Sequence, residues 1–375
     1  MAKKKRVDFR KNRTKPPRVN DLTSGFREHG FEEEAPKSGE RVRSKGDLSR
    51  KRTIAIDESG QGSMPAVDLA SCVPGRIVRC HGLDNIVHLD DGRILRCKVR
   101  RLLKSLSIDE RSIVTTGDRV WVRPAPNEEG FIERVEPRHG LLTRASRGRE
   151  HILVANVDQV AIVIALVEPE LKPHLIDRYI ASAEQGKIKP ILCLNKVDLA
   201  DPIEHQPLVG YYSQLGVPTI LTSATTGQGI DRLRRLLKGR QSVFSGQSGV
   251  GKSSLLNAVQ PGLGLRVRTV SDVNQKGRHT TTTTHLLELE IGGWVVDTPG
   301  IRTFDLWNLI PEQVEGLFAE FRPFVALCDF PDCTHTHEQR CAVKQAVEDR
   351  RISERRYLSY LGIYTGKMED RAEED

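Results

Sequence analysis

Residues 246–253 have the spacing of a phosphate-binding loop, Gly-x-x-x-x-Gly-Lys-Ser. An apolar segment ending at Phe244 precedes them and a helix-forming segment, 254–259, follows, which is the strand–loop–helix context that the motif needs. Glycines let successive N–H groups point at one anion, and the N-terminus of the next helix adds partial positive charge. Lys252 would reach the β- and γ-phosphates, and the Ser253 hydroxyl would ligate Mg²⁺. The residues predicted to bind the phosphates are Gly246, Gln247, Ser248, Gly249, Val250, Gly251, Lys252, Ser253 and Ser254.

A second motif predicts that the base is guanine. Asn195-Lys196-Val197-Asp198 directly follows an apolar strand at 191–194. Asp198 would accept hydrogen bonds from the guanine N1–H and amino group, a donor pair that adenine lacks. Asn195 would orient the loop and the base edge, and Lys196 would lay its stem along the ring. Ser223 and Ala224, after the next apolar strand, would contact the guanine carbonyl.

The remaining nucleotide motifs follow the phosphate loop. Asp297-Thr298-Pro299-Gly300 ends a predicted strand, where Asp297 would hold Mg²⁺ through water and the Gly300 N–H would face the γ-phosphate. Residues 276–284 are rich in threonine and are predicted to be the switch that folds over Mg²⁺, with Thr281 or Thr282 as the metal ligand. Because base recognition here precedes phosphate binding in the chain, the sequence predicts a circularly permuted GTPase.

The catalytic group is harder to identify from the residues. Ile301 follows the Asp-Thr-Pro-Gly motif, and an apolar side chain cannot orient the attacking water. His279 in the predicted switch is the nearest candidate for positioning or deprotonating that water. The alternative is that His279 is a surface histidine or a contact to RNA.

A Cys/His cluster lies near the C-terminus. Cys328, Cys333, His335 and Cys341 offer three thiolates and one imidazole within 14 residues, a set that suits a closed, structural zinc site. His337 is a competing ligand, although His335 gives the tighter loop. The helix predicted after the cluster carries four arginines and several aromatic residues, so it would either bind RNA or pack on the GTPase domain.

Charge is unevenly distributed along the 375 residues. Residues 1–52 carry 17 Lys+Arg against 8 Asp+Glu, a net of +9, whereas the remainder carries 41 against 42. The basic arm has few large apolar residues, and its most natural partner is a polyanion, with nucleic acid ahead of a membrane surface. A solubilising tail is the alternative. The scattered cysteines at 72, 80, 97 and 193 and the absence of a long apolar run predict a reducing, cytoplasmic location without a membrane span.

These segments predict a multidomain chain. We expect a basic flexible arm at 1–72, an oligonucleotide-binding (OB) β-barrel at 73–140, a circularly permuted P-loop α/β GTPase domain at 141–304 and a helical zinc-binding domain at 305–375. The barrel prediction depends on five short strands with Asp90-Asp91-Gly92 as a hairpin turn. Arginines and Trp121 along those strands would bind nucleic acid, or the arginines are simply solvated. Its arginines and lysine are Arg76, Arg79, Arg93, Arg96, Lys98, Arg100 and Arg101.

With these residues in view, the chain resembles the RsgA/YjeQ (EngC) family over about residues 73–365. The resemblance rests on the permuted order, Gly-Arg-His-Thr-Thr-Thr at 277–282, Asp-Thr-Pro-Gly-Ile at 297–301 and the Cys/His pattern. It implies an OB barrel, a GTPase and a zinc domain that act on the small (30S) ribosomal subunit late in assembly, with stimulation by that subunit and with His279 implicated in hydrolysis. The arm at 1–72 departs from the family pattern.

The function predicted from this sequence is a GTP hydrolase, with GTP, GDP and the small subunit's rRNA as partners, that acts as a monomer and is released by hydrolysis. Its cofactors would be one structural Zn²⁺, and Mg²⁺ with GTP. The alternative is a GTP-regulated RNA-binding scaffold whose hydrolysis is incidental. Action on the large subunit or in translation is disfavoured by the combination of barrel and zinc cluster.

Overall fold

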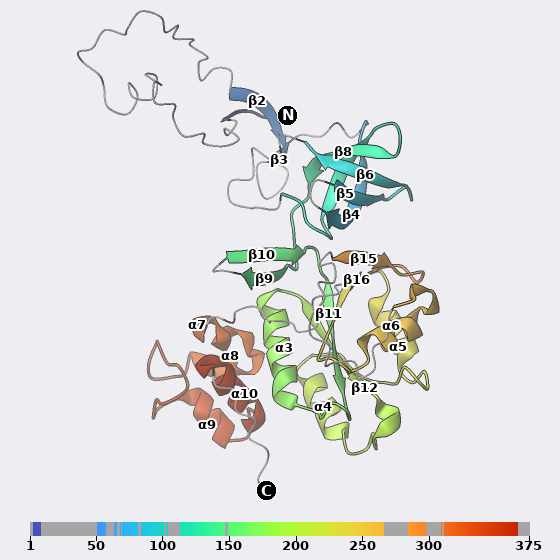
Figure 1. Ribbon diagram of the computed structural model, residues 1–375. Helices are drawn as coiled ribbons and strands as arrows, with labels where there is room; N and C mark the ends of the chain where they lie inside the picture. The colour runs from blue at the N-terminus through green and yellow to red at the C-terminus, as the bar shows by residue number, and fades with distance from the viewer. Residues whose placement is uncertain are drawn as a thin grey trace, which may run out of the picture.

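Figure 1 shows the computed structural model of the chain. The residues whose structure is described here are 3–8, 51–57, 64–65, 68, 70–81, 84–100, 103, 113–146, 149–265, 284–297, 309 and 311–366. They form a β-barrel, an α/β body below it in the view and a helical C-terminal region beside that body. Among these residues, no helix is long and apolar enough to cross a membrane.

The barrel is built from five strands in the order expected of an OB fold. They are β4 (Val73–His81), β5 (Asp84–Leu89), β6 (Ile94–Val99), β7 (Arg119–Pro124) and β8 (Glu129–Val135). The hydrogen-bonded order is β4-β5-β6-β8-β7, and a β4–β7 pairing closes the barrel. Apolar side chains alternate along each strand and fill the interior, as Val87, Val122 and Ile132 illustrate. The predicted barrel is confirmed.

The α/β body has a mainly parallel sheet. In spatial order its strands are β13 (Thr219–Thr222), β12 (Lys189–Asn195), β11 (Gln159–Ala165), β14 (Gln241–Ser245), β16 (Trp294–Asp297) and β15 (His285–Glu288). Only β15 in this set is antiparallel to its neighbour. β11 lies in the middle and all seven of its residues are buried, which explains its unbroken apolar sequence.

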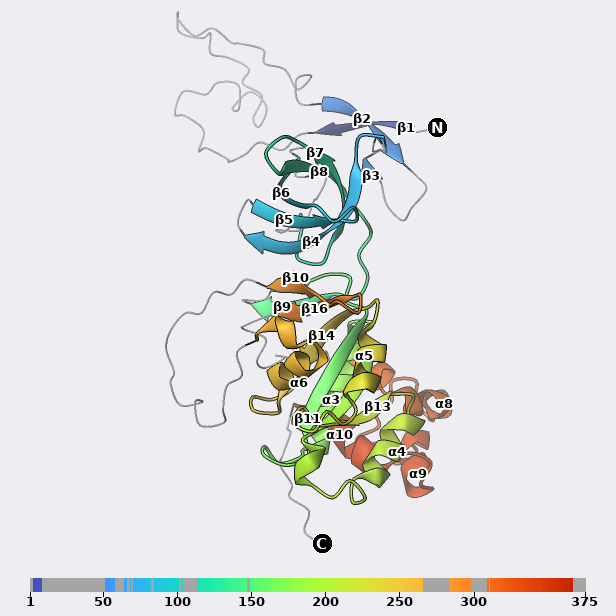
Figure 2. The ribbon, with the colours of Figure 1, turned by 90° about the vertical axis from the view of Figure 1, so that its right-hand side faces the viewer.

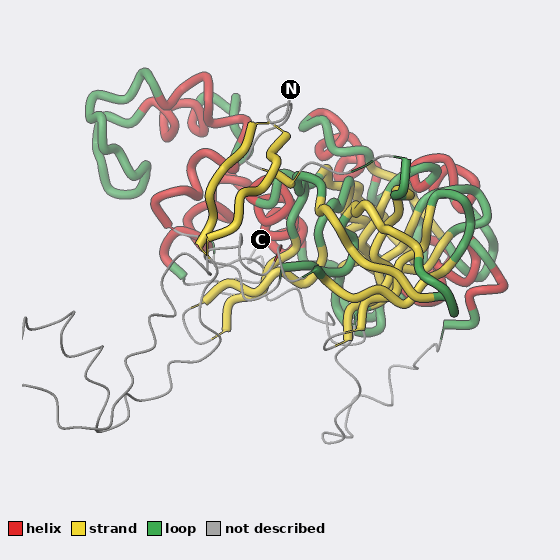
Figure 3. The backbone as a smooth tube through the Cα atoms, turned by 90° about the horizontal axis from the view of Figure 1, so that it is seen from above, coloured by secondary structure: helices red, strands yellow, loops and turns green. Residues whose placement is uncertain are grey.

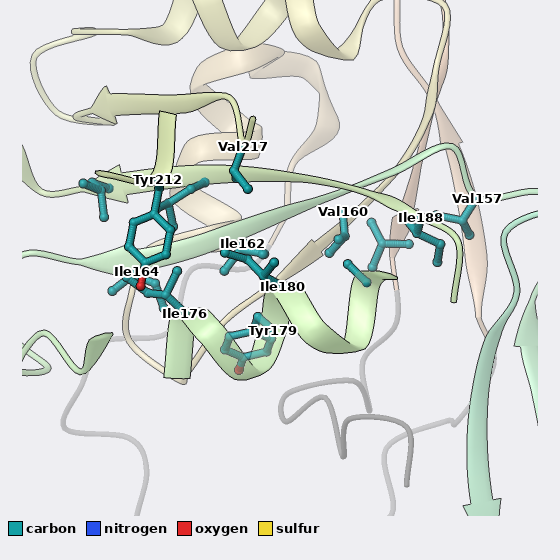
Figure 4. Packing of buried hydrophobic residues seen from close by; sticks show 14 of the residues in the cluster. Val157, Val160, Ile162, Ile164, Ile176, Tyr179, Ile180, Ile188, Tyr212 and Val217 are labelled. Atoms are coloured by element: carbon teal, nitrogen blue, oxygen red, sulfur yellow. The ribbon is translucent and has the colours of Figure 1, made fainter. Parts of the chain in front are cut away.

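Helices cover both faces of this sheet. They are α3 (Pro173–Gln185), α4 (Gln206–Gln214), α5 (Ile230–Leu237) and α6 (Lys252–Val259), with short 3₁₀ turns η2 (Val197–Leu199) and η3 (Pro261–Leu263). Residues of β11 alternate between two cores: Ile162 and Ile164 pack with α3 and α4 (Figure 4), whereas Ala161 and Val163 pack with α5 and α6. The domain is therefore doubly wound, as predicted.

Within the described part of the chain, one backbone pairing joins the barrel to this sheet. Arg79 of β4 lies opposite His285 of β15, so the two sheets form one eleven-stranded sheet. Between the barrel and the body, β9 (Leu142–Ser146) and β10 (Arg149–Val154) form a hairpin that the sequence analysis did not predict.

The C-terminal region consists of short helices. These are α7 (Pro311–Val314), η5 (Glu315–Leu317), η6 (Ala319–Phe321), α8 (Arg322–Val325), α9 (Ala342–Glu348) and α10 (Glu354–Thr365). α10 packs against α3 of the α/β body, and α7 to α10 lie beside α3 in Figure 1. Seen from above, helices lie on both sides of the strands (Figure 3). The region has its own core, centred on Phe318, Phe321 and Tyr360.

Three strands precede the barrel. β1 (Lys3–Asp8) pairs with β2 (Lys51–Asp57), which pairs with β3 (Met64–Pro65), and β3 lies against β8 of the barrel. The sequence analysis predicted no strands in this part of the chain. Figure 2 shows β1, β2 and β3 at the barrel end of the molecule.

Candidate nucleotide and metal sites

The phosphate-loop sequence joins β14 to α6 as predicted. Gly246 has φ of 142°, and a Cβ at this position would lie 2.0 Å from the Val163 carbonyl oxygen of β11. Gly249 and Gly251 have φ of 84° and 94°. The loop therefore needs glycine at these positions, because side chains there would be strained and at Gly246 would meet the central strand.

The Lys252 ammonium lies over this loop. Its Nζ donates to the carbonyl oxygens of Gly246 at 2.7 Å and Gln247 at 2.6 Å. Ser253 and Ser254 follow in the first turn of α6 and are partly exposed. The lysine, the two hydroxyl groups and the N–H groups in the first turn of α6 form a cationic, donor-rich surface that suits an anion.

Asn195 connects the predicted base site to the phosphate loop. Its Nδ2 donates to the Val250 carbonyl oxygen at 2.7 Å, and its Oδ1 accepts from Thr222 Oγ1 at 3.2 Å. A Cβ on Gly251 would lie 2.4 Å from Asn195 Nδ2. Because the Asn195 side chain is buried and both ends of its amide are bonded, it holds the ends of β12 and β13 against the loop.

The rest of the base motif lies at the end of β12. Lys196 adopts φ of 63° and its Nζ donates to the Glu168 carbonyl oxygen, while Asp198 is exposed in η2. Ser223 follows β13, and its Oγ accepts from Thr226 N at 3.1 Å. Ala224 is the next residue and is partly exposed. Since these residues follow neighbouring parallel strands, they meet at one edge of the sheet.

Asp297 ends β16, whose register with β14 brings it to the same edge of the sheet. The other predicted residues of the switches, His279, Thr281, Thr282 and Gly300, lie outside the residues that the structure describes. The described part of the chain thus brings together the phosphate loop, the base motif and the backbone of Asp297.

The four predicted zinc ligands are brought together. The ligand atoms of Cys328, Cys333, His335 and Cys341 all lie within 4.8 Å of one another. The Nδ1 of His335 is 3.6 Å from Cys328 Sγ and 3.3 Å from Cys341 Sγ. The competing candidate, His337, has an 82 % exposed side chain and lies outside the cluster.

The surroundings of the cluster fit a metal. Glu315 Oε2 is 3.1 Å from His335 Nε2, which leaves Nδ1 to face the sulfur atoms. Such a carboxylate–histidine pair commonly orients metal-bound imidazoles. Burial raises the pKa of Cys333 to about 12, so its thiolate would need a nearby cation. Three sulfurs and one oriented imidazole at these spacings could bind zinc.

Two tyrosines of α10 hold the loop that carries His335. Tyr357 donates to the His335 carbonyl oxygen at 2.7 Å, and Tyr360 donates to the Thr334 carbonyl oxygen at 2.8 Å. His335 itself has φ of 57°, in the left-handed region. These bonds offset the strain of that conformation and connect the cluster to the helix that packs on the α/β body.

Arg356 of α10 is buried at the junction with the α/β body. Its guanidinium donates to Asp177 Oδ1 of α3 at 3.0 Å and to Glu320 Oε1 at 2.5 Å, and it lies 4.3 Å from the centroid of the Phe318 ring. Asp177 also accepts from Ser359 and Tyr212, at 2.6 and 2.7 Å. Burial lowers the pKa of Arg356, but the two carboxylates outweigh it and hold the pKa above its usual value. Arg356 therefore packs α10 on the α/β body, which is one of the two roles predicted for this helix.

The barrel meets the α/β body through side-chain hydrogen bonds and ring packing. The Arg76 guanidinium of β4 donates to Gln241 Oε1, and Gln241 Nε2 donates to the Ala155 carbonyl oxygen at 2.8 Å. Thr116 Oγ1 donates at 3.4 Å to the carbonyl oxygen of Thr284, the last residue of the predicted switch. His88 of β5 packs on Trp294 of β16, with ring centroids 5.3 Å apart.

Most of the predicted nucleic-acid contacts of the barrel have protein partners. Arg93 bonds to Asp91, Arg96 to Asp84 and Arg100 to Glu133, while Lys98 lies 4.0 Å from Glu129. The indole N–H of Trp121 donates to Glu136 Oε1 at 2.6 Å. Arg101 lies outside the described residues.

Sequence reasoning missed Glu315, Asp177 and Gln241. None of them belongs to a recognisable motif, and their partners are distant in the chain. One available signal was an ionisable residue at the buried positions of an amphipathic helix, which singles out Asp177 on α3.

Together, the doubly wound sheet, the phosphate loop and the base motif that precedes it in the chain define a circularly permuted P-loop GTPase, here with an OB-type barrel and a Cys₃His cluster. The sequence model of the RsgA GTPase family matches residues 135–307. Two proteins named small ribosomal subunit biogenesis GTPase RsgA are similar in sequence. The one from Shewanella oneidensis is 39 % identical over 84 % of this chain and 90 % of its own length. The one from Thermotoga petrophila is 40 % identical over 77 % and 95 %.

Two solved structures are also similar to this chain. YjeQ from Thermotoga maritima aligns with a TM-score of 0.67 at 36 % identity, covering 80 % of this chain and all of that one. YloQ, described as a circularly permuted GTPase, aligns with a TM-score of 0.63 at 26 % identity, over 83 % of this chain and all of that one. The chain belongs to the RsgA GTPase family.

Proposed function

We propose that this protein hydrolyses GTP while bound to the small ribosomal subunit, assists the late maturation of that subunit and leaves it when GTP is hydrolysed. The observation that carries the proposal is the Asn195 side chain, which joins the base motif to the phosphate loop in a family whose curated relatives are named for small-subunit biogenesis. We also propose that the protein is a monomer and that it is located in the cytoplasm.

In this proposal Asp198 reads the guanine edge, and Ser223 and Ala224 contact the guanine carbonyl. The loop at 246–254 binds the phosphates, and Lys252 leaves its loop carbonyls to pair with the β- and γ-phosphates. Ser253, Asp297 and Thr281 or Thr282 would hold Mg²⁺, which supplies positive charge where negative charge develops. The Gly300 N–H would contact the γ-phosphate.

His279 positions or deprotonates the attacking water in the proposed reaction, because Ile301 offers no polar group for that purpose. The zinc proposed at Cys328, Cys333, His335 and Cys341 is structural. It would supply no chemistry to the reaction and would fix the loops around α10.

The test is GTP hydrolysis by the purified protein alone, with isolated small subunits and with isolated large subunits. We expect small subunits alone to raise the rate, because the family name implies that partner. Stimulation by large subunits, or by neither, would reject the proposed partner while leaving guanine binding intact.

His279→Ala separates the enzyme from a scaffold with incidental hydrolysis. General acid–base groups typically contribute about 10²–10⁴-fold, so we expect a loss of that order in the stimulated rate with GDP affinity unchanged. His337→Ala, at a side chain that is 82 % exposed, is the matched control. An unchanged rate in His279→Ala would remove the catalytic role and favour the scaffold.

A further inference from the structure

One aromatic ring on the outside of the barrel is exposed and has a cation over its face. Phe131 of β8 is 37 % exposed, and the Arg123 guanidinium carbon of β7 lies 5.4 Å from the centroid of its ring. Its neighbours along the strand, Gly130 and Ile132, are buried. The ring therefore points away from the barrel core.

Cations flank this ring on both sides. In the strand register Phe131 lies opposite Lys98 of β6 and Arg123 of β7, so the three side chains form one row across the outer face. Lys98 and Arg123 are 58 % and 52 % exposed, with Lys98 lying 4.0 Å from Glu129 and Arg123 bonded to Glu133. A flat apolar ring between two accessible cations is complementary to a nucleobase and its flanking phosphates.

Ionic contacts within the protein hold Arg123 in place beside Phe131. Arg123 Nε bonds to Glu133 Oε1 at 3.0 Å, and Arg100 bonds to the other oxygen of the same carboxylate. Because two guanidinium groups share one carboxylate, this cluster keeps a positive charge. We call Phe131, Arg123, Lys98, Arg100 and Glu133 the β8 platform.

The β8 platform lies on the side of the barrel that faces away from the α/β body. OB folds commonly bind nucleic acid on their second and third strands, which are β5 and β6 here. On β5, His88 packs on Trp294 and lies 3.3 Å from Glu288 of the α/β body. Figures 1 and 2 both show β8 on the side of the barrel away from that body. Contact with the α/β body therefore turns part of the usual face inward and leaves β8 accessible.

The N-terminal strands approach the same place. β3 lies against β8, and the Phe131 ring is exposed with β3 present. β3 pairs with β2, which follows the basic segment of the chain. The sequence that leads into β2 is basic, which favours a polyanion over an uncharged partner.

We propose that the β8 platform stacks an unpaired base of single-stranded RNA on Phe131, with Arg123 and Lys98 contacting the adjacent phosphates. The proposal rests on the proposed function in naming RNA as the partner, and adds the residue that stacks and the face that binds. Trp121, the stacking residue predicted from the sequence, is only partly exposed and its N–H is bonded to Glu136, whereas the Phe131 side chain is exposed.

The experiment measures binding of the full-length protein to fluorescently labelled, unstructured oligo(U) and oligo(A) RNA by anisotropy at several salt concentrations. Stacking on an aromatic ring is worth about 1–3 kcal/mol per base, so Phe131→Leu should weaken binding by about 5- to 150-fold with an unchanged salt slope. Phe131→Trp should bind at least as tightly as the parent. Arg123→Gln should weaken binding and lower the salt slope by about 1.

The matched control is Ile203→Ala, at an apolar side chain on the α/β body that is 74 % exposed, and it should bind RNA like the parent. If Phe131→Leu binds RNA like the parent, the platform is overturned, even where small subunits still stimulate hydrolysis and the proposed function stands. If Phe131→Leu loses small-subunit binding but keeps RNA binding, the ring contacts protein and the assignment to RNA is wrong. If the parent binds neither RNA nor small subunits, the proposed function fails together with the platform.

Discussion

The barrel and the C-terminal region are both fixed to the α/β body, but by different kinds of contact. At the barrel, amide and hydroxyl groups bond mostly to backbone, the Arg76 guanidinium bonds to the neutral Gln241 amide, and the partly exposed His88 lies beside Glu288. Two glycines there allow very close approach of chain segments: a Cβ at Gly117 or Gly140 would lie 2.1 or 1.9 Å from a carbonyl oxygen. At the C-terminal region, Arg356 and Asp177 are buried, the Glu320 side chain is 13 % exposed, and the Phe318 ring lies beside the guanidinium.

Because the two junctions with the α/β body are built from different contacts, they should differ in their sensitivity to substitution. Backbone contacts spread over a connecting segment have no single side chain on which the junction depends. A buried ionic cluster concentrates its free energy in a few groups, and removing one leaves the others charged and without a counter-ion. The barrel junction should therefore tolerate most side-chain changes, whereas the C-terminal junction should not.

Removing metal should have the largest effect. Structural Zn²⁺ typically contributes about 10–16 kcal/mol of apparent binding free energy, so a strong chelator should unfold the C-terminal region. In limited proteolysis we expect rapid cleavage between 309 and 366, while fragments spanning the barrel and the α/β body persist. Persistence of the C-terminal region at zero bound metal would show that the Cys₃His cluster needs none.

The substitution Arg356→Met should have the second-largest effect on stability. It leaves the carboxylates of Asp177 and Glu320 without their counter-ion, and losing one partner of a buried ion pair costs about 3–5 kcal/mol. The free energy of unfolding in urea would measure this, and Arg351→Met, at an exposed arginine between α9 and α10, is the control. The double change Asp177→Asn with Arg356→Met should recover part of the loss. Equal stability of Arg356→Met and the parent would contradict the ionic description of this junction.

At the barrel junction the sensitive position is a glycine. Gly117 has φ of 95°, and an added Cβ would lie 2.1 Å from the Ala155 carbonyl oxygen, so Gly117→Ala should cost about 2–3 kcal/mol. Gly92 has a similar φ of 89° with nothing within 4 Å of its Cβ, so Gly92→Ala should cost only about 1 kcal/mol. Thermal unfolding of the two variants separates the clash from the backbone strain. A similar loss in both would mean that the close approach at Gly117 contributes nothing.

Acid should weaken the C-terminal region through Glu338. Burial raises the pKa of this carboxyl, but hydrogen bonds from Thr334 and Thr336 outweigh burial and lower it to about 2. Since the folded pKa lies below the ordinary value of about 4.3, the stabilisation is complete above that pH and is lost as the pH falls toward 2. Glu338→Gln should cost about 2 kcal/mol at pH 7 and less at pH 3. Glu348→Gln, on the exposed side of α9, is the control; a cost for Glu338→Gln that does not change with pH would reject the linkage.

Much of this structure followed from local sequence. The glycines of the phosphate loop, the unbroken apolar run of β11 and the alternating strands of the barrel each determine their own conformation, and all were predicted. The spacing of the cysteines with His335 likewise predicted one cluster, since short loops leave the ligands few ways to meet.

The junctions could not be predicted, because their partners are far apart in the chain. Asp177 and Arg356 are both ordinary charged residues in their own segments, and only the packing of α10 on α3 makes them a pair. The same holds for Phe131, whose place between Lys98 and Arg123 depends on the register of three strands. The roles of His279, Thr281, Thr282 and Gly300 stay predictions from the motif.

The pairing of Arg79 with His285 has a mechanical consequence. A force that pulls the barrel away from the α/β body would load this pair together with the other contacts of the junction, such as His88 on Trp294 and the Ala155 N–H bond to the Thr116 carbonyl oxygen. These contacts would part before the longer strand pairing behind them. The next strand inward, β16, would still be held to β15 by a four-residue register. Tension on the barrel would therefore be relieved at β4 before it reached the strand that ends at Asp297.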